Sequence, residues 1–203
     1  MTAAATPKGA KRRLALVDAA ADLLVEGGFD AVRHRAVAAK AGVPLASTTY
    51  YFASLDDLIA AAVERCGIRE LRVMQARIDE VAHHTRDVES TVELIVDMLV
   101  GVFDEGEGGR EQLVNRYERF VAFARHPELR AVQRGLRVEL DALIVSVLQR
   151  SGREVHRDGL RRLVYVVDGA VVGALSEGDA DPKALAREML LQVIDRVAPL
   201  ATA

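Results

Sequence analysis

The side chains of this chain that could do chemistry form a short run of hydroxyl and tyrosine residues at positions 47–51. The run reads Ser-Thr-Thr-Tyr-Tyr and contains no acidic residue. Hydroxyl groups donate hydrogen bonds to phosphate oxygens or to base edges, and an apolar neighbour such as Leu45 can contact a thymine methyl group. These residue types therefore suit contact with DNA. The alternative is an ordinary helix that buries the same threonines and tyrosines in a core.

A glycine turn joins this run to another short helix. Residues 36–41 are rich in alanine and predict a short helix, and Gly42 supplies the turn that follows it. Pro44 suits the start of the next helix because its fixed φ is already helical. We expect that second helix at residues 45–51. Two helices joined by a tight glycine turn form a helix-turn-helix, whose second helix fits the major groove of DNA.

The distribution of charge also points to DNA at one end of the chain. The whole chain carries a formal net charge of −3, which argues against a protein that coats nucleic acid over its entire surface. Residues 1–52, however, hold seven Lys and Arg against four Asp and Glu. We expect this basic end to face phosphates while the acidic remainder is kept away from them.

The rest of the chain predicts helices and no strand, because its apolar residues recur at steps of three and four. We expect residues 1–9 to be a flexible arm and the glycine pair 27–28 to end the first helix. The predicted helices are residues 10–26, 36–41, 45–51, 54–82, 88–103, 110–125, 128–150, 155–176 and 182–197. About nine helices in 203 residues make an all-α protein.

Residues 10–65 resemble the N-terminal domain of the TetR family of bacterial transcriptional repressors. The pattern that matches comprises 26–29, 37–43, Ser47, Tyr51, Phe52, Ser54 and 56–58. The resemblance implies a three-helix DNA-binding domain at residues 10–56, followed by an effector-binding and dimerisation bundle at residues 57–203. It implies a cytoplasmic, sequence-specific regulator of transcription. Such a regulator is a homodimeric repressor that a small-molecule effector releases from double-stranded operator DNA.

We expect the DNA contacts to come from the helix-turn-helix and the residues just before it. Hydrogen bonds to phosphates would come from the hydroxyl groups of Thr48, Thr49, Tyr50 and Tyr51. Arg33 and Arg35 would add positive charge beside them. The full predicted DNA-binding set is Arg33, His34, Arg35, Pro44, Leu45, Ala46, Ser47, Thr48, Thr49, Tyr50 and Tyr51.

The C-terminal bundle is expected to dimerise. Residues 155–176 are apolar nearly all round, so one face of this helix should meet something beyond its own core. The resemblance implies a symmetric four-helix interface built with residues 182–197, although the same residues could instead form a monomer's core. The predicted interface residues are Leu163, Val167, Ala170, Val171, Ala174, Met189 and Val193.

The bundle is also expected to bind the effector. Apolar walls with a few polar groups describe a small-molecule pocket, but they describe an ordinary core equally well. The predicted pocket residues are Met98, Phe103, Tyr117, Phe120, Phe123, Tyr165 and Asp168.

No catalytic, metal or cofactor site is predicted. Glu80 and His83 have the spacing of a di-iron motif, but such a site needs a second copy, which the chain lacks. Cys66 lies on an apolar stripe and is expected to be structural. No run of about 20 apolar residues predicts a membrane span. An all-helical enzyme and a protein-binding adaptor remain the alternatives, and specific binding to DNA would separate them from a repressor.

Overall fold

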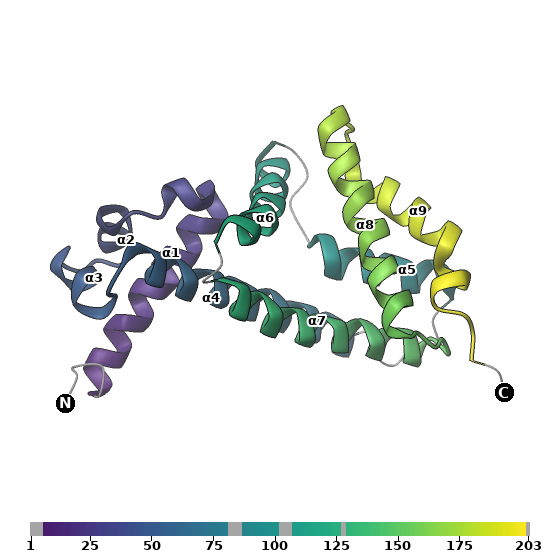
Figure 1. Ribbon diagram of the computed structural model, residues 1–203, viewed down its shortest axis with the longest axis horizontal. Helices are drawn as coiled ribbons and strands as arrows, with labels where there is room; N and C mark the ends of the chain where they lie inside the picture. The colour runs from purple at the N-terminus through teal and green to yellow at the C-terminus, as the bar shows by residue number, and fades with distance from the viewer. Residues whose placement is uncertain (1–5, 81–86, 102–106, 127–128, 202–203) are drawn as a thin grey trace. The chain divides into compact units, whose positions relative to one another are not determined.

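The computed structural model describes residues 6–80, 87–101, 107–126 and 129–201, and within these ranges the chain forms nine α-helices and no β-strand (Figure 1). This confirms the predicted all-α class. The helices are α1 (Pro7–Ala31), α2 (His34–Lys40), α3 (Ala46–Tyr51), α4 (Leu55–Glu80), α5 (Val88–Val100), α6 (Glu107–Arg125), α7 (Arg130–Arg150), α8 (Arg157–Glu177) and α9 (Pro182–Val197).

The chain divides into two compact units. The first comprises Met1–Arg69 and Glu105–Leu136, and the second comprises Glu70–Asp104 and Arg137–Ala203. The first unit therefore contains α1 to α3, the first half of α4, and α6. The second unit contains the rest of α4, α5, most of α7, α8 and α9.

Helix α1 begins earlier than the sequence predicted. The Thr6 hydroxyl accepts a hydrogen bond from the Gly9 amide at 3.1 Å, and Pro7 occupies the first turn. A hydroxyl cap followed by proline is a favourable helix start. The prediction of a flexible arm is therefore wrong for residues 6–9, and residues 1–5 lie outside the described part of the chain.

The predicted end of α1 at the glycine pair is a break within the helix. Gly27 and Gly28 leave helical geometry, and Gly28 has a φ of +65°, after which one more turn runs to Ala31. The side-chain amide of Asn115 on α6 lies 3.5 Å from the Val25 carbonyl oxygen beside this break. The break thus lies against a buried polar residue of α6.

The core of the first unit holds α1 against α4. Leu16 and Leu24 of α1 are fully buried, as are Val37 and Leu58. At the edge of this core, Asp18 of α1 receives hydrogen bonds from two arginines of α4. This apolar core and these ion pairs hold α1 and α4 together, and α2 and α3 pack against the same core.

The core of the second unit uses the residues that the sequence assigned to a dimer interface. The side chains of α8 that pack inward, toward α9 and α5, are at most 7% exposed. Leu163, Val167, Ala170, Val171 and Ala174 are therefore core residues of the protomer, and their prediction as interface residues is wrong. Met189 is 40% exposed and Val193 is half-buried, so neither belongs to that buried set.

The residues after α9 fold back on the loop between α7 and α8. The buried guanidinium of Arg153 donates to a carboxylate oxygen of Asp195 at 2.7 Å and to the Ala198 carbonyl at 2.8 Å. A single β-bridge pairs Arg153 with Leu200. The end of α9 is thus tied to the loop that precedes α8.

No described helix is long and apolar enough to cross a bilayer. No three His, Cys, Asp or Glu side chains of the described ranges come together in a way that could hold a metal ion.

Candidate nucleic-acid interface

The turn between α2 and α3 is fixed by two main-chain hydrogen bonds. The amide of Gly42 donates to the Ala39 carbonyl at 3.2 Å, and the amide of Val43 donates to the Ala38 carbonyl at 3.0 Å. Gly42 has a φ of +64°, the left-handed conformation that commonly ends a helix in this way. The helix-turn-helix predicted from the sequence is therefore present, and α3 follows the turn directly.

One side of α3 packs into the core. Thr48 is 0% exposed, and its hydroxyl donates to the Leu45 carbonyl at 2.8 Å. A buried hydroxyl that is already bonded to the main chain cannot reach a phosphate. The prediction that Thr48 contacts DNA is therefore wrong, and this residue anchors α3.

The opposite side of α3 faces solvent. Tyr50 is 63% exposed and Leu45 is 48% exposed, while Ala46 and Thr49 are also exposed. The rings of Tyr50 and Tyr51 meet edge to face at 5.0 Å. No acidic side chain belongs to α3, so this surface carries no charge that would repel DNA. Pro44, just before the helix, is exposed as well.

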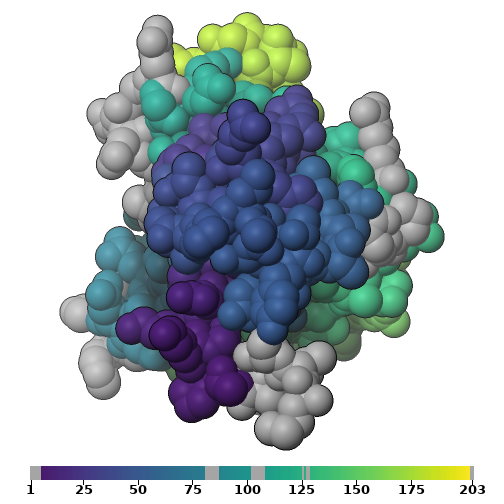
Figure 2. All heavy atoms as spheres, turned by 90° about the vertical axis from the view of Figure 1, so that its left-hand side faces the viewer, coloured from purple at the N-terminus to yellow at the C-terminus, as the bar shows by residue number. Residues whose placement is uncertain are grey.

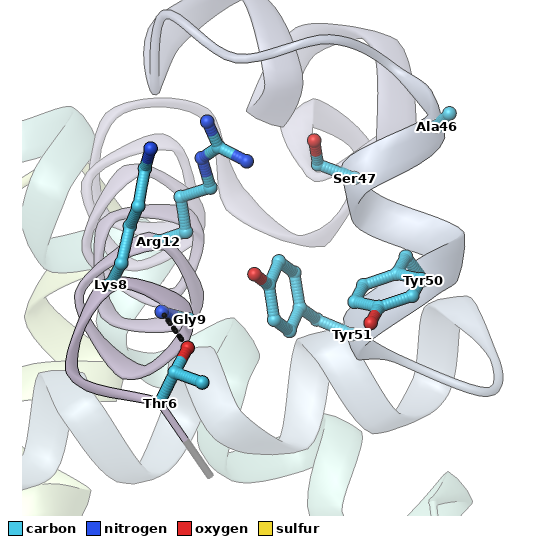
Figure 3. Close-up of a pocket in the computed structure, with 8 residues that line it drawn as sticks. All are labelled: Thr6, Lys8, Gly9, Arg12, Ala46, Ser47, Tyr50 and Tyr51. Atoms are coloured by element: carbon cyan, nitrogen blue, oxygen red, sulfur yellow. Dashed lines mark hydrogen bonds between the residues drawn. The ribbon is translucent and has the colours of Figure 1, made fainter. Parts of the chain in front are cut away.

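A groove lies between the first turns of α1 and the flank of α3 (Figure 3). It is open to solvent, has a volume of about 440 Å³, and is lined by Thr6, Lys8, Gly9, Arg12, Ala46, Ser47, Tyr50 and Tyr51. Lys8 and Arg12 come from α1, and the ring of Tyr51 points from α3 toward α1. Figure 2 shows the same start of α1, in purple, beside the blue helix-turn-helix. Cationic and hydroxyl side chains therefore share one open groove.

The basic residues around the helix-turn-helix differ in whether they have acidic partners. Arg33 pairs with Asp30 at 2.9 Å, and Lys40 pairs with Glu26 at 2.8 Å. Arg35 is exposed and forms no ion pair with any described residue. Of the two arginines predicted to help bind phosphates, Arg33 therefore already has an anionic neighbour.

His34 is placed differently from its neighbours. Its side chain is half-buried at the start of α2, and its Nδ1 atom is buried without a hydrogen-bond partner in the described residues. The structure therefore turns one edge of this imidazole away from solvent.

The sequence prediction left out the two cations of the groove. Lys8 and Arg12 are four residues apart and share a face of α1, but the predicted arm ended at residue 9, which separated them. The signal that could have joined them was the Thr6-Pro7 pair, which is typical of a helix start.

The residues predicted to form an effector pocket divide between the two units. Tyr117, Phe120 and Phe123 of α6 lie together in the first unit, with ring centres 5.6 Å and 6.4 Å apart. In the second unit Met98 is buried, Asp168 is half-buried, and Tyr165 is 62% exposed. Phe103 lies outside the described residues. The three aromatic residues of α6 are therefore the part of this set that is gathered in one place.

Comparison with known proteins places the chain among bacterial regulators. Residues 16–62 match the model described as bacterial regulatory proteins, tetR family. Residues 86–196, more than half of the chain, match the model described as tetracyclin repressor-like, C-terminal domain. No curated protein matches the chain.

Solved structures show the same likeness over most of the chain. The multidrug binding protein EbrR complexed with ethidium has 31% sequence identity and a TM-score of 0.67, with 91% of this chain and 98% of that one covered. The same protein complexed with proflavin has 30% identity and a TM-score of 0.66, covering 90% of this chain and 99% of that one. A TetR-family member from Streptomyces coelicolor A3 has 30% identity and a TM-score of 0.60, covering 90% and 98%.

Proposed function

The chain belongs to the TetR family of bacterial regulatory proteins, and we propose that it is a homodimeric repressor whose helix-turn-helix units bind a palindromic operator. As a member of this family it is a DNA-binding regulator of transcription and not an enzyme. In this proposal residues 10–56 bind DNA, residues 57–203 bind effector and the second subunit, and the protein acts in the cytoplasm.

The outward face of α3 is the observation that carries the proposal. It presents a 63% exposed tyrosine, Tyr50, next to Ala46 and Thr49, with no acidic residue on the helix. The buried Thr48 and the turn at Gly42 hold this face in place. A short rigid helix with exposed hydroxyl and apolar groups suits the major groove, where bases are read by hydrogen bonds and by contact with thymine methyl groups.

The outward face of α8 supports the proposed dimer. Tyr165 is 62% exposed and Val172 is 47% exposed, and both lie opposite the buried side of the helix. A side chain added at Gly169 or Gly173 would meet nothing within 4 Å in the protomer. These residues give α8 an exposed face where a second α8 could pack closely, and Met189 of α9 is also exposed. A two-fold dimer presents two recognition helices to two half-sites.

The ligand complexes of EbrR support the proposal that this chain also binds a small-molecule effector. That protein is described as a multidrug binding protein, and its complexes contain ethidium and proflavin. We propose that the predicted pocket residues gathered on α6, Tyr117, Phe120 and Phe123, bind a small organic effector in this chain. The effector would favour a dimer whose helix-turn-helix units no longer match adjacent major grooves, because it has a different affinity for the two states.

The proposal is tested by selecting DNA with the protein itself. The wild-type chain is used to enrich duplexes from a random library, and fluorescence anisotropy then compares the enriched duplex with a scrambled one. We expect Tyr50→Ala to weaken binding to the enriched duplex about tenfold, the size of one lost base contact. Val121→Ala is the matched control, since Val121 on α6 is also 63% exposed.

Failure to enrich any duplex would reject the repressor and favour a protein-binding adaptor. Unchanged affinity in Tyr50→Ala would reject α3 as the helix that reads the bases. Retained helical circular dichroism in both variants establishes that the fold is intact.

A further inference from the structure

We propose that the groove between α1 and α3 binds a phosphodiester group of the DNA backbone, with Lys8 and Arg12 as its cationic contacts. The proposal rests on the proposed function, since it takes the occupant to be DNA. It adds a contact region on α1 to the region that the sequence predicted on α2 and α3.

The shape of the groove favours this occupant. It is open along one side and has a volume of about 440 Å³, so a phosphate group that remains attached to a strand can enter it. Its walls come from two helices, with Lys8 and Arg12 on α1 and Ser47 and Tyr51 on α3 (Figure 3). A groove that is closed on every side would admit only a free small molecule.

The donors in the groove match a phosphate group. The two cations can each form a charge-assisted hydrogen bond to an anionic oxygen, and the hydroxyl groups of Ser47 and Tyr51 can donate as well. No carboxylate lines the groove. Serine, tyrosine, lysine and arginine are all among the side chains that contact phosphates in protein–DNA complexes.

The cations of the groove, like Arg35 and unlike Arg33 and Lys40, have no acidic partner among the described residues. Arg33 lies against Asp30, and Lys40 lies against Glu26. Lys8 and Arg12 form no ion pair with any residue in the described ranges. An external anion can therefore bind Lys8 and Arg12 without first breaking an ion pair within the described residues.

The position of the groove relative to the outward face of α3 also fits. Ala46 and Tyr50 lie on that outward face and also line the groove. A duplex whose bases contact Tyr50 would therefore bring an adjoining stretch of backbone to the groove. One docking position thus serves both the base-reading face and the phosphate contact.

The test compares single charge removals on α1. Lys8→Gln and Arg12→Gln each remove a groove cation. Lys11→Gln is the matched control, because Lys11 is an exposed cation of the same helix that does not line the groove. Anisotropy titrations with the enriched duplex and with a scrambled duplex are carried out over a series of KCl concentrations. Circular dichroism establishes that each variant is folded.

We expect each groove variant to bind about tenfold more weakly and to lower the slope of log K against log salt by about 1, because one phosphate contact is lost. The loss should be nearly equal on both duplexes, since backbone contacts carry no sequence information. Arg12→Lys should keep the slope, and Lys11→Gln should change it least.

Two outcomes overturn the proposal in distinguishable ways. If Lys8→Gln and Arg12→Gln match Lys11→Gln while Tyr50→Ala still weakens binding, the groove holds no phosphate and the proposed function stands. If the wild-type protein binds neither duplex, the proposed function fails and the groove assignment fails with it.

Discussion

The Nε atom of Arg65 lies 2.6 Å from a carboxylate oxygen of Asp18, and this ion pair joins α4 to α1 within the first unit. Arg69, one turn further along α4, donates to the same oxygen of Asp18 and also to Asp22, each at 2.6 Å. Burial alone would raise the pKa of Asp18, but the hydrogen bonds and charges of the two arginines outweigh it and lower the pKa below 3.8. Asp18 is thus held in its charged form.

The first prediction is that Asp18→Asn removes a pH-dependent part of the stability. Since the folded-state pKa is below the ordinary value, the unfolded state binds protons more readily. The contribution is therefore present above about pH 4 and is lost as the pH falls through the lowered pKa. We expect Asp18→Asn to lower the free energy of unfolding by about 1 kcal/mol at pH 7, the upper range for a partly exposed pair.

Urea denaturation at several pH values between 7 and 3 measures this difference. Asp30→Asn is the control, because Asp30 and its partner Arg33 are both well exposed and should contribute little. A difference between wild type and Asp18→Asn that stays constant down to pH 3 would contradict the predicted linkage.

The second prediction concerns the turn at Gly42. Its φ of +64° is costly for a residue with a Cβ atom, although the added atom itself would meet nothing within 4 Å. We expect Gly42→Ala to lower the free energy of unfolding by about 1 kcal/mol. Gly42→Asn should lower it less, because asparagine tolerates this conformation. Thermal unfolding measures both.

Gly135 provides the opposite control. It lies within α7 in helical conformation, with open space where a Cβ would be. Gly135→Ala should therefore stabilise the protein by about 0.5–1 kcal/mol. If both glycine-to-alanine changes had the same sign, backbone conformation would not be the cause.

The third prediction tests the proposed dimer face of α8. Val172→Glu places a charge on this face, and we expect it to yield monomers at concentrations where the wild type is dimeric, because a charge without a partner is costly to bury. Val138→Glu is the matched control, since Val138 on α7 is 69% exposed and lies away from α8 and α9 in the sequence. Sedimentation velocity distinguishes the two species. A dimer that survives Val172→Glu would move the interface elsewhere.

The fourth prediction concerns the contact that ties the end of α9 to the loop between α7 and α8. Arg153 is 6% exposed, and Arg153→Met removes its hydrogen bonds to Asp195 and to the Ala198 carbonyl. We expect Arg153→Met to lower the free energy of unfolding by about 1–3 kcal/mol, because the buried Ala198 carbonyl loses its hydrogen-bond donor. Asp195→Asn should cost much less, since Asp195 is 83% exposed. Equal losses in the two variants would show that the ion pair, and not the carbonyl contact, stabilises this region.

The sequence predicted the helix-turn-helix well because local signals agree there. Gly42 needs its left-handed conformation, and the helices on each side are short and have clear ends. The start of α1 was missed because Thr6 and Pro7 follow only five residues, which show no helical apolar periodicity, so the capping signal stood alone.

Two other errors have a common cause. Thr48 is polar by type, but its hydroxyl bonds to the main chain of its own helix, which permits burial. On α8, Leu163 and Val172 are both apolar, yet one is buried and the other is 47% exposed. Residue type alone does not tell which side of an apolar helix meets the core, and only tertiary packing decides it.

The burial of Thr48 has a consequence for how the DNA preference of this protein could change. Because that position is fixed by packing and Gly42 by backbone conformation, substitutions on α3 can be accepted mainly at Ala46, Thr49 and Tyr50. We expect duplicated copies of such a gene to diverge at these surface positions while the anchoring threonine stays constant. A laboratory search for altered specificity can be confined to the same few codons.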